Sequence, residues 1–117
     1  MSVGYVEDTI VAQATPVGEG AIGIIRLSGP DSAKILAKIF SGTKSPADFE
    51  DHRLYLGELN DPASGETTDQ VMAVWMKSPH SFTGEEVVEI HSHGGVFVMT
   101  KILETVQRCG ARVAEPG

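Results

Sequence analysis

The pattern of hydrophobic and polar positions divides the chain into short strands and two helices. Runs that are dense in β-branched residues and bounded by Gly, Pro or polar clusters are typical of strands. Five such runs lie at 9–15, 21–29, 52–59, 69–77 and 85–93, and a sixth, shorter one lies at 111–114. The turn sequence at 60–66, NDPASGE, predicts that the third and fourth runs form a hairpin.

Two further segments carry apolar residues at helical spacing. The first opens at Pro30 and is expected to end just before Gly42, and the second spans 96–108 with Gly110 at its C′ position. Their apolar positions are Ile35, Leu36, Ile39 and Phe40 in the first segment, and Val98, Ile102, Leu103 and Val106 in the second. Amphipathic helices pack on a sheet, and a polar loop is expected over 41–51. The pattern therefore predicts one domain over residues 1–117.

Composition narrows the class of protein. A hydrophobic content of 41% and 13 glycines are typical of a soluble globular α/β or α+β protein. Nine Lys and Arg against 16 Asp and Glu give a net charge of -7, the wrong sign for a surface that neutralises phosphates, so any RNA must be held elsewhere. The single cysteine, the missing signal peptide and the lack of a membrane-length apolar run favour a cytoplasmic protein without a membrane partner.

The glycines Gly18, Gly20 and Gly23 satisfy the dinucleotide pattern G-x-G-x-x-G after a predicted strand. That motif needs a helix next, whose N-terminus faces the pyrophosphate. Here a strand-like run follows instead. We therefore expect a tight turn, or a place where a ligand approaches the backbone.

The run at 85–93 carries unusual side chains. In a strand, Val87, Glu89, His91 and His93 share one face. A carboxylate-x-His-x-His array can ligate zinc or another divalent metal, whereas the alternative is a half-exposed polar strand face. Arg26 lies within the apolar run at 21–29 and needs a carboxylate or ligand partner unless it reaches solvent at an edge.

Three longer stretches together point to a family. DTIVAQATPVGEGAIGIIRLSG, SFTGEEVVEIHSHGG and the terminal AEPG resemble the N-terminal domain of the TrmE family of tRNA-modification GTPases, over nearly all of the chain. The resemblance implies an α+β domain with a mixed sheet packed by two amphipathic helices, similar to the folate-binding domain of tetrahydrofolate-dependent aminomethyltransferases. Such a domain forms a homodimer and binds 5-formyl-tetrahydrofolate or a related one-carbon folate.

The resemblance also implies a longer protein with helical and G domains. That protein uses GTP, Mg2+ and K+, and modifies the wobble uridine of tRNA with an FAD-dependent partner. The 117 residues contain no phosphate loop, no magnesium-binding aspartate motif and no C-terminal cysteine motif. We therefore expect an N-terminal fragment that binds folate, with no catalytic residue of its own and no GTP hydrolysis.

Carried over position by position, the folate contacts are Arg26 and Glu89. Weaker candidates from the same motifs are Thr83, His93, Gly94 and Gly95. A carboxylate can accept hydrogen bonds from both the N3 hydrogen and the 2-amino group of a pterin. An arginine can instead donate two parallel hydrogen bonds to a carbonyl or carboxylate of the ligand. The glycines leave room for the ring and expose N–H groups at the next helix N-terminus. A further lysine contact is expected beyond residue 117.

The resemblance gives His91 no role, which weakens the metal hypothesis, and no metal is expected. Two other functions remain as alternatives. One is a structural dimerisation domain without a ligand. The other is a small metal-dependent enzyme that uses Glu89, His91 and His93.

Overall fold

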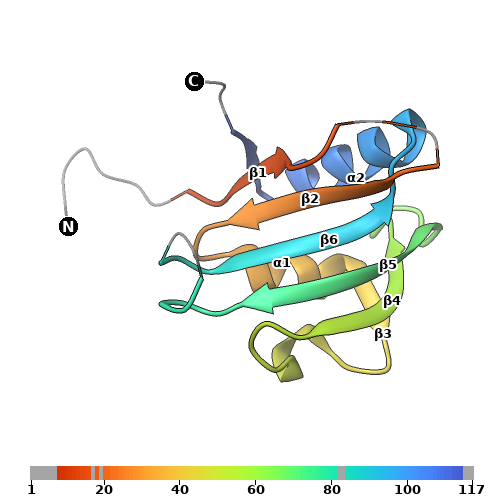
Figure 1. The fold of residues 1–117 in the computed structure, drawn as a ribbon. Helices are drawn as coiled ribbons and strands as arrows, with labels where there is room; N and C mark the ends of the chain where they lie inside the picture. Colours follow the sequence, from red (N-terminus) through yellow and green to blue (C-terminus); the bar gives the residue numbers. More distant parts are fainter. Residues whose placement is uncertain (1–7, 17, 19, 82–83, 115–117) are drawn as a thin grey trace.

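The computed structural model describes residues 8–16, 18, 20–81 and 84–114, which form one seven-stranded sheet with two α-helices behind it (Figure 1). The strands are β1 (Ile10–Gln13), β2 (Ile22–Ser28), β3 (Phe40–Gly42), β4 (Leu54–Asn60), β5 (Thr67–Met76), β6 (Val87–His93) and β7 (Arg112–Val113). The helices are α1 (Ser32–Ile39) and α2 (Val96–Arg108), and a 3-10 turn, η1, spans Pro46–Asp48. The strand order is β3-β4-β5-β6-β2-β1-β7, and only β1 and β7 are parallel. The predicted α+β class with a mixed sheet is confirmed.

The apolar pattern places the core between the sheet and the helices. Along β2, Ile25 and Leu27 are fully buried on the helix side, whereas Arg26 between them lies on the opposite face. The hairpin of β4 and β5 is confirmed, with a register shift at Leu59/Asn60. Both helices lie on the same side of the sheet (Figure 1). No helix or strand of the described residues lies over the other face, which we call the uncovered face.

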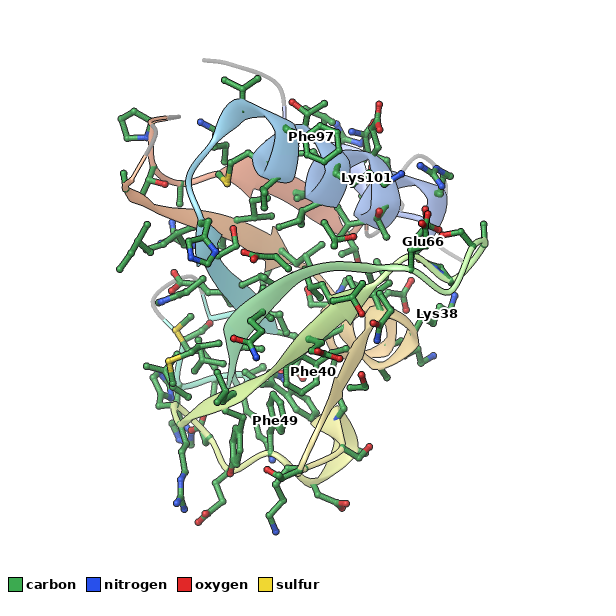
Figure 2. The ribbon with its side chains drawn as sticks, turned by 90° about the vertical axis from the view of Figure 1, so that its right-hand side faces the viewer. Lys38, Phe40, Phe49, Glu66, Phe97 and Lys101 are labelled. Carbon is green, nitrogen blue, oxygen red and sulfur yellow. The ribbon has the colours of Figure 1, made fainter. Side chains whose placement is uncertain are left out.

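The end of the first helix differs from the prediction. The helix ends at Ile39, and Gly42 is not a residue beyond a helix end but the last residue of β3. Phe40 has extended backbone angles (φ −107°, ψ 133°), and its ring packs edge-on against Phe49, with 5.6 Å between ring centroids (Figure 2). Phe49 is also stacked on Tyr55 and is buried. The polar loop expected over 41–51 is confirmed for most of its length, since nearly all of its residues are exposed. It was wrong at Ser41 and Gly42, which belong to β3, and at Phe49, which packs into the core.

The second helix has the predicted bounds, and Gly110 has a φ of +116° just beyond it, as a C′ glycine should. Its buried face is rotated from the predicted one. The buried residues are Met99, Ile102, Thr105 and Val106, whereas Val98 and Leu103 are partly buried at the side. Met99 takes the central position because it packs over Gly23, where an added Cβ would lie 2.3 Å from its sulfur. No helix in the described part of the chain is long and apolar enough to cross a membrane.

A buried carboxylate ties the β4–β5 turn to α2. The Asp61 carboxylate accepts the backbone N–H of Ala63 at 2.9 Å and lies 3.4 Å from Lys101 Nζ and 3.6 Å from Arg108 Nη1. The Ala63 N–H lowers the pKa of Asp61, burial opposes it, and the bond from Lys101 lowers it further. Figure 2 shows Lys101 on α2 facing this end of the hairpin, near Glu66. This clamp fixes one end of α2 against the sheet.

Candidate ligand-binding site

The uncovered face of the sheet carries Arg26 and Glu89 near its centre. Arg26 on β2 is the direct cross-strand partner of Glu89 on β6, and Val74 on β5 lies on the other side of Glu89. The four β6 residues predicted to share a face pair with alternate β2 residues, as Val87 with Ser28, Glu89 with Arg26, His91 with Ile24 and His93 with Ile22. The predicted polar strand face therefore exists, and β2 supplies its arginine.

Arg26 and Glu89 form an ion pair. Nε and Nη2 of Arg26 donate to the same oxygen, Oε2 of Glu89, at 2.8 and 2.6 Å. The Glu89 side chain is 14% exposed and that of Arg26 is 35% exposed. Burial acts to raise the pKa of Glu89, but hydrogen bonds from His91 and Arg26 and their charges outweigh it, so the pKa lies below its usual value. Glu89 is thus an ionised acceptor at neutral pH, and the expectation of a carboxylate partner for Arg26 is confirmed.

His91 occupies the other oxygen of the same carboxylate. Its Nε2 lies 2.9 Å from Glu89 Oε1. Because an ionised carboxylate can only accept, Nε2 of His91 carries the proton. The family resemblance gave this histidine no role, and the metal hypothesis used it only as a metal ligand. The signal was present in the period of two, which places residues 89 and 91 next to each other on one strand face.

A shallow hollow of about 290 Å³ lies beside this cluster on the uncovered face. Its lining comes from four strands and comprises Ile22, Leu56, Gln70, Val71, Met72, His91, Ser92 and His93. An apolar concavity with a few polar groups at one end is typical of a small-molecule site. Typical ligand pockets measure roughly 300–1,000 Å³, so this hollow suits one ring system better than a whole drug-sized ligand.

His93 at the rim of the hollow is held by a residue that the sequence did not single out. Both oxygens of Asp69 lie 2.9 Å from His93 Nδ1, and Asp69 Oδ2 also accepts the His93 backbone N–H at 2.9 Å. With Nδ1 donating to the carboxylate, the neutral ring has Nε2 as an acceptor. Asp69 lies in β5, so no local sequence pattern links it to His93.

Of the three side chains of the metal hypothesis, Glu89 and His91 are bonded to each other, whereas His93 has a separate partner. Glu89 is bonded to Arg26 and His91, while His93 is bonded to Asp69. Among residues 8–16, 18, 20–81 and 84–114, no three His, Cys, Asp or Glu side chains are grouped so as to hold a metal ion. The geometry therefore gives no support to the metal-dependent enzyme.

Gly18 and Ala21 of the glycine-rich segment belong to a turn that is hydrogen-bonded to Gly94. The Gly94 N–H donates to the Ala21 carbonyl at 2.7 Å, and the Gly18 N–H donates to the Gly94 carbonyl at 2.8 Å. A Cβ at Gly94 would lie 2.9 Å from the Ala21 oxygen, and Gly20 has a φ of +75°. The expected tight turn is confirmed, but the expectation that Gly94 exposes its N–H to a ligand was wrong, because the turn already accepts it. Gly95 is the N-cap residue of α2, and its carbonyl accepts the Met99 N–H.

Comparison with known proteins decides the family. Residues 9–117 match the family model described as GTP-binding protein TrmE N-terminus. The chain belongs to this family. It is 54% identical over 113 residues to the tRNA modification GTPase MnmE of Geobacter metallireducens, a match that covers 97% of this chain and 25% of that protein. The MnmE proteins of Streptococcus sanguinis and Syntrophobacter fumaroxidans are 52% and 50% identical over 110 residues, covering 94% of this chain and 24% and 23% of theirs.

The chain thus spans about a quarter of the length of the curated relatives it matches. The family that the sequence motifs indicated is confirmed. Of the candidate contacts carried over from the TrmE family, the structure brings together Arg26 and Glu89. His93 lies four residues beyond Glu89 along β6 and lines the hollow, whereas Arg26 and Glu89 are not among its lining residues. Thr83 lies outside the described residues.

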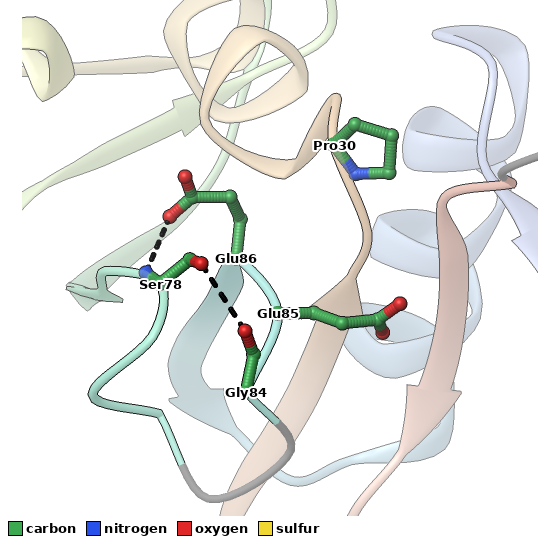
Figure 3. A pocket seen from close by; sticks show the side chains of 5 residues that line it. All are labelled: Pro30, Ser78, Gly84, Glu85 and Glu86. Carbon is green, nitrogen blue, oxygen red and sulfur yellow. Dashed lines mark hydrogen bonds between the residues drawn. The ribbon is translucent and has the colours of Figure 1, made fainter.

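A second hollow of this TrmE-family domain, of about 210 Å³, is lined by Pro30, Ser78, Gly84, Glu85 and Glu86 (Figure 3). Its carboxylates serve the protein itself. Glu86 Oε1 accepts the Ser78 N–H at 2.8 Å and Trp75 Nε1 at 3.1 Å, and the Ser28 hydroxyl donates to Glu85 at 3.1 Å. The described lining carries two acidic side chains and no basic one, so it does not favour an anionic ligand such as a folate.

Proposed function

We propose that this chain is a folate-binding and homodimerising domain whose ligand is 5-formyl-tetrahydrofolate or a related one-carbon folate. We further propose that its fold is similar to the folate-binding domain of tetrahydrofolate-dependent aminomethyltransferases. The single observation that carries the proposal is the ionised Glu89, held by Arg26 beside an apolar hollow. These two residues are the ones at which the family's folate contacts fall.

The chemistry of the cluster suits a pterin. The pterin edge presents a ring N–H and an amino group side by side, and a carboxylate is the side chain that accepts both. Glu89 supplies that carboxylate, and Arg26 keeps it charged. Ile22 and Met72 offer apolar contact to the ring, and His93 offers its Nε2 as an acceptor at the rim.

The homodimer is proposed to form through the uncovered sheet face. Exposed strand edges, the other candidate surface, are short, since the edge strands β3 and β7 have three and two residues. The face instead exposes Ile22 (69%) and Leu56 (62%), and Leu54 and Met72 are partly exposed (44% and 39%). A stable interface buries roughly 800 Å² on each partner, and a second copy laid on this face would close the shallow hollow over the ligand.

We also propose that the domain belongs to a longer protein that hydrolyses GTP, with Mg2+ and K+, and that modifies the wobble uridine of tRNA with an FAD-dependent partner in the cytoplasm. The support is that the relatives carry the name tRNA modification GTPase and are about four times as long as this chain. The net charge of -7 favours tRNA contacts outside these residues.

Calorimetric titration of the chain with 5-formyl-tetrahydrofolate, together with sedimentation at tens of micromolar, tests the proposal. Saturable binding by a dimer is expected. A dimer that gives no heat up to millimolar ligand would instead favour the structural dimerisation domain. A stoichiometric divalent ion in the purified protein would favour the metal-dependent enzyme.

A further inference from the structure

The Glu89 carboxylate has little acceptor capacity left in the structure. An ionised carboxylate offers about four lone-pair sites, two on each oxygen. Nε and Nη2 of Arg26 both donate to Oε2, and His91 Nε2 donates to Oε1. One site, on Oε1, is therefore left. A ligand edge that donates two hydrogen bonds to this carboxylate needs two such acceptor sites.

We propose that His91 is a specificity-determining residue that competes with the ligand for Oε1 of Glu89 and is displaced when a two-donor edge binds. This inference rests on the proposed folate function. It selects for ligands whose two adjacent N–H groups replace the His91 bond, and against ligands that bring a single donor.

The ligand is expected to displace His91 from the Glu89 carboxylate, and not Arg26. The Arg26 contact consists of two bonds from a permanently charged donor to the charged carboxylate, whereas His91 makes a single bond to it. His91 holds Oε1 by one bond and comes from the same strand, two residues along. The His91 ring also lines the hollow beside Glu89, so it stands where an incoming ring would lie.

The test compares His91→Ala, His91→Gln and wild type for affinity toward 5-formyl-tetrahydrofolate. In His91→Ala the ligand competes with water alone, so we expect binding to be tighter by roughly 10-fold to 150-fold, the value of one hydrogen bond to a charged acceptor. His91→Gln restores an amide donor and should return the affinity to near the wild-type value. His80→Ala is the matched control, because His80 is an exposed histidine that lies 3.5 Å from Asp51 and is not part of the lining of the hollow, and it should leave the affinity within a factor of two.

Weaker binding by His91→Ala would overturn the proposal, since it would mean that the histidine assists the ligand. A loss common to His91→Ala and His91→Gln would overturn it as well. A simple structural role cannot produce tighter binding on truncation, so the sign of the effect separates competition from support.

A second measurement tests the His91–Glu89 pairing separately from ligand binding. In NMR spectra of the unliganded chain, Glu89→Gln should shift the ring resonances of His91, and saturating ligand should shift them in the wild type. If Glu89→Gln moves them but the wild type binds no folate, the pairing stands and the folate function fails. If Glu89→Gln leaves them unmoved, the His91–Glu89 pairing itself is wrong.

Discussion

Removing the charge of Arg26 should expose how strongly the sheet depends on its ion pair with Glu89. Arg26→Met keeps a long side chain on the uncovered face but removes both donors to Oε2. Glu89→Gln keeps the shape of the acceptor and removes its charge. The two variants and the double variant form a thermodynamic cycle that isolates the pairwise free energy.

The magnitude follows from the burial of the pair. Exposed ion pairs contribute about 0–1 kcal/mol, and hydrogen bonds to charged groups about 1.5–3 kcal/mol. With Glu89 14% and Arg26 35% exposed, the pair lies between these cases, and we expect a coupling free energy of about 1–2 kcal/mol. Lys34 and Asp31 form a matched control, since they lie 4.0 Å apart and are mostly exposed, and their coupling should be below about 0.5 kcal/mol.

The assay is urea denaturation of the four proteins at pH 7 and again in acid. Because the pKa of Glu89 is lowered in the folded protein, its contribution to stability is fully present above the unfolded value of about 4.3 and is lost as the pH falls through the folded value. The coupling should therefore shrink on acidification below about pH 4. A pH 7 coupling no larger than that of the control pair, or one that persists in acid, would refute the reasoning.

Three further predictions concern the fold and the assembly. Gly57→Ala should destabilise the domain by about 1–3 kcal/mol in urea, because an added Cβ would lie 2.4 Å from the Phe40 ring and 2.6 Å from a backbone oxygen; an unchanged midpoint would contradict this packing. Asp61→Asn should lower stability at neutral pH, and this loss should shrink as the pH falls below about 4, because the pKa of Asp61 is lowered in the folded protein and its charge is lost only as the pH falls through that lowered value; a loss that stays equal down to strong acid would count against the clamp. Leu56→Glu should shift the sedimentation of the chain toward monomer, and an intact dimer would place the interface elsewhere.

The elements were predictable where local pattern decides them. The β-branched runs fixed the strands, the bounds of α2 followed from its glycine neighbours, and Gly110 was found at its C′ position. The junction after α1 was not predictable, because Phe40 continues the helical spacing. Its extended conformation depends on pairing with β4 and on packing against Phe49.

In the candidate site too, local sequence pattern predicted some residues and could not predict others. The period of two placed Glu89 on a polar strand face, and the cost of a buried charge predicted a partner for Arg26. Asp69 could not be found this way, since it meets His93 only through the β5–β6 arrangement. Gly94 was misjudged because the turn that accepts its N–H comes from residues 18–21, more than 70 positions away in the chain.

We propose Glu89 as the acceptor for the ligand, and calorimetric titration of Glu89→Ala with 5-formyl-tetrahydrofolate measures this role. Losing a charged acceptor costs about 1.5 to 3 kcal/mol, so affinity should fall roughly 10-fold to 150-fold while circular dichroism shows a folded domain. Arg26→Ala should give a loss of similar order. The control is Glu85→Ala, because Glu85 lies two residues before β6 and lines the other hollow. This variant should bind the ligand as the wild type does. Wild-type affinity in a folded Glu89→Ala variant would contradict the claim.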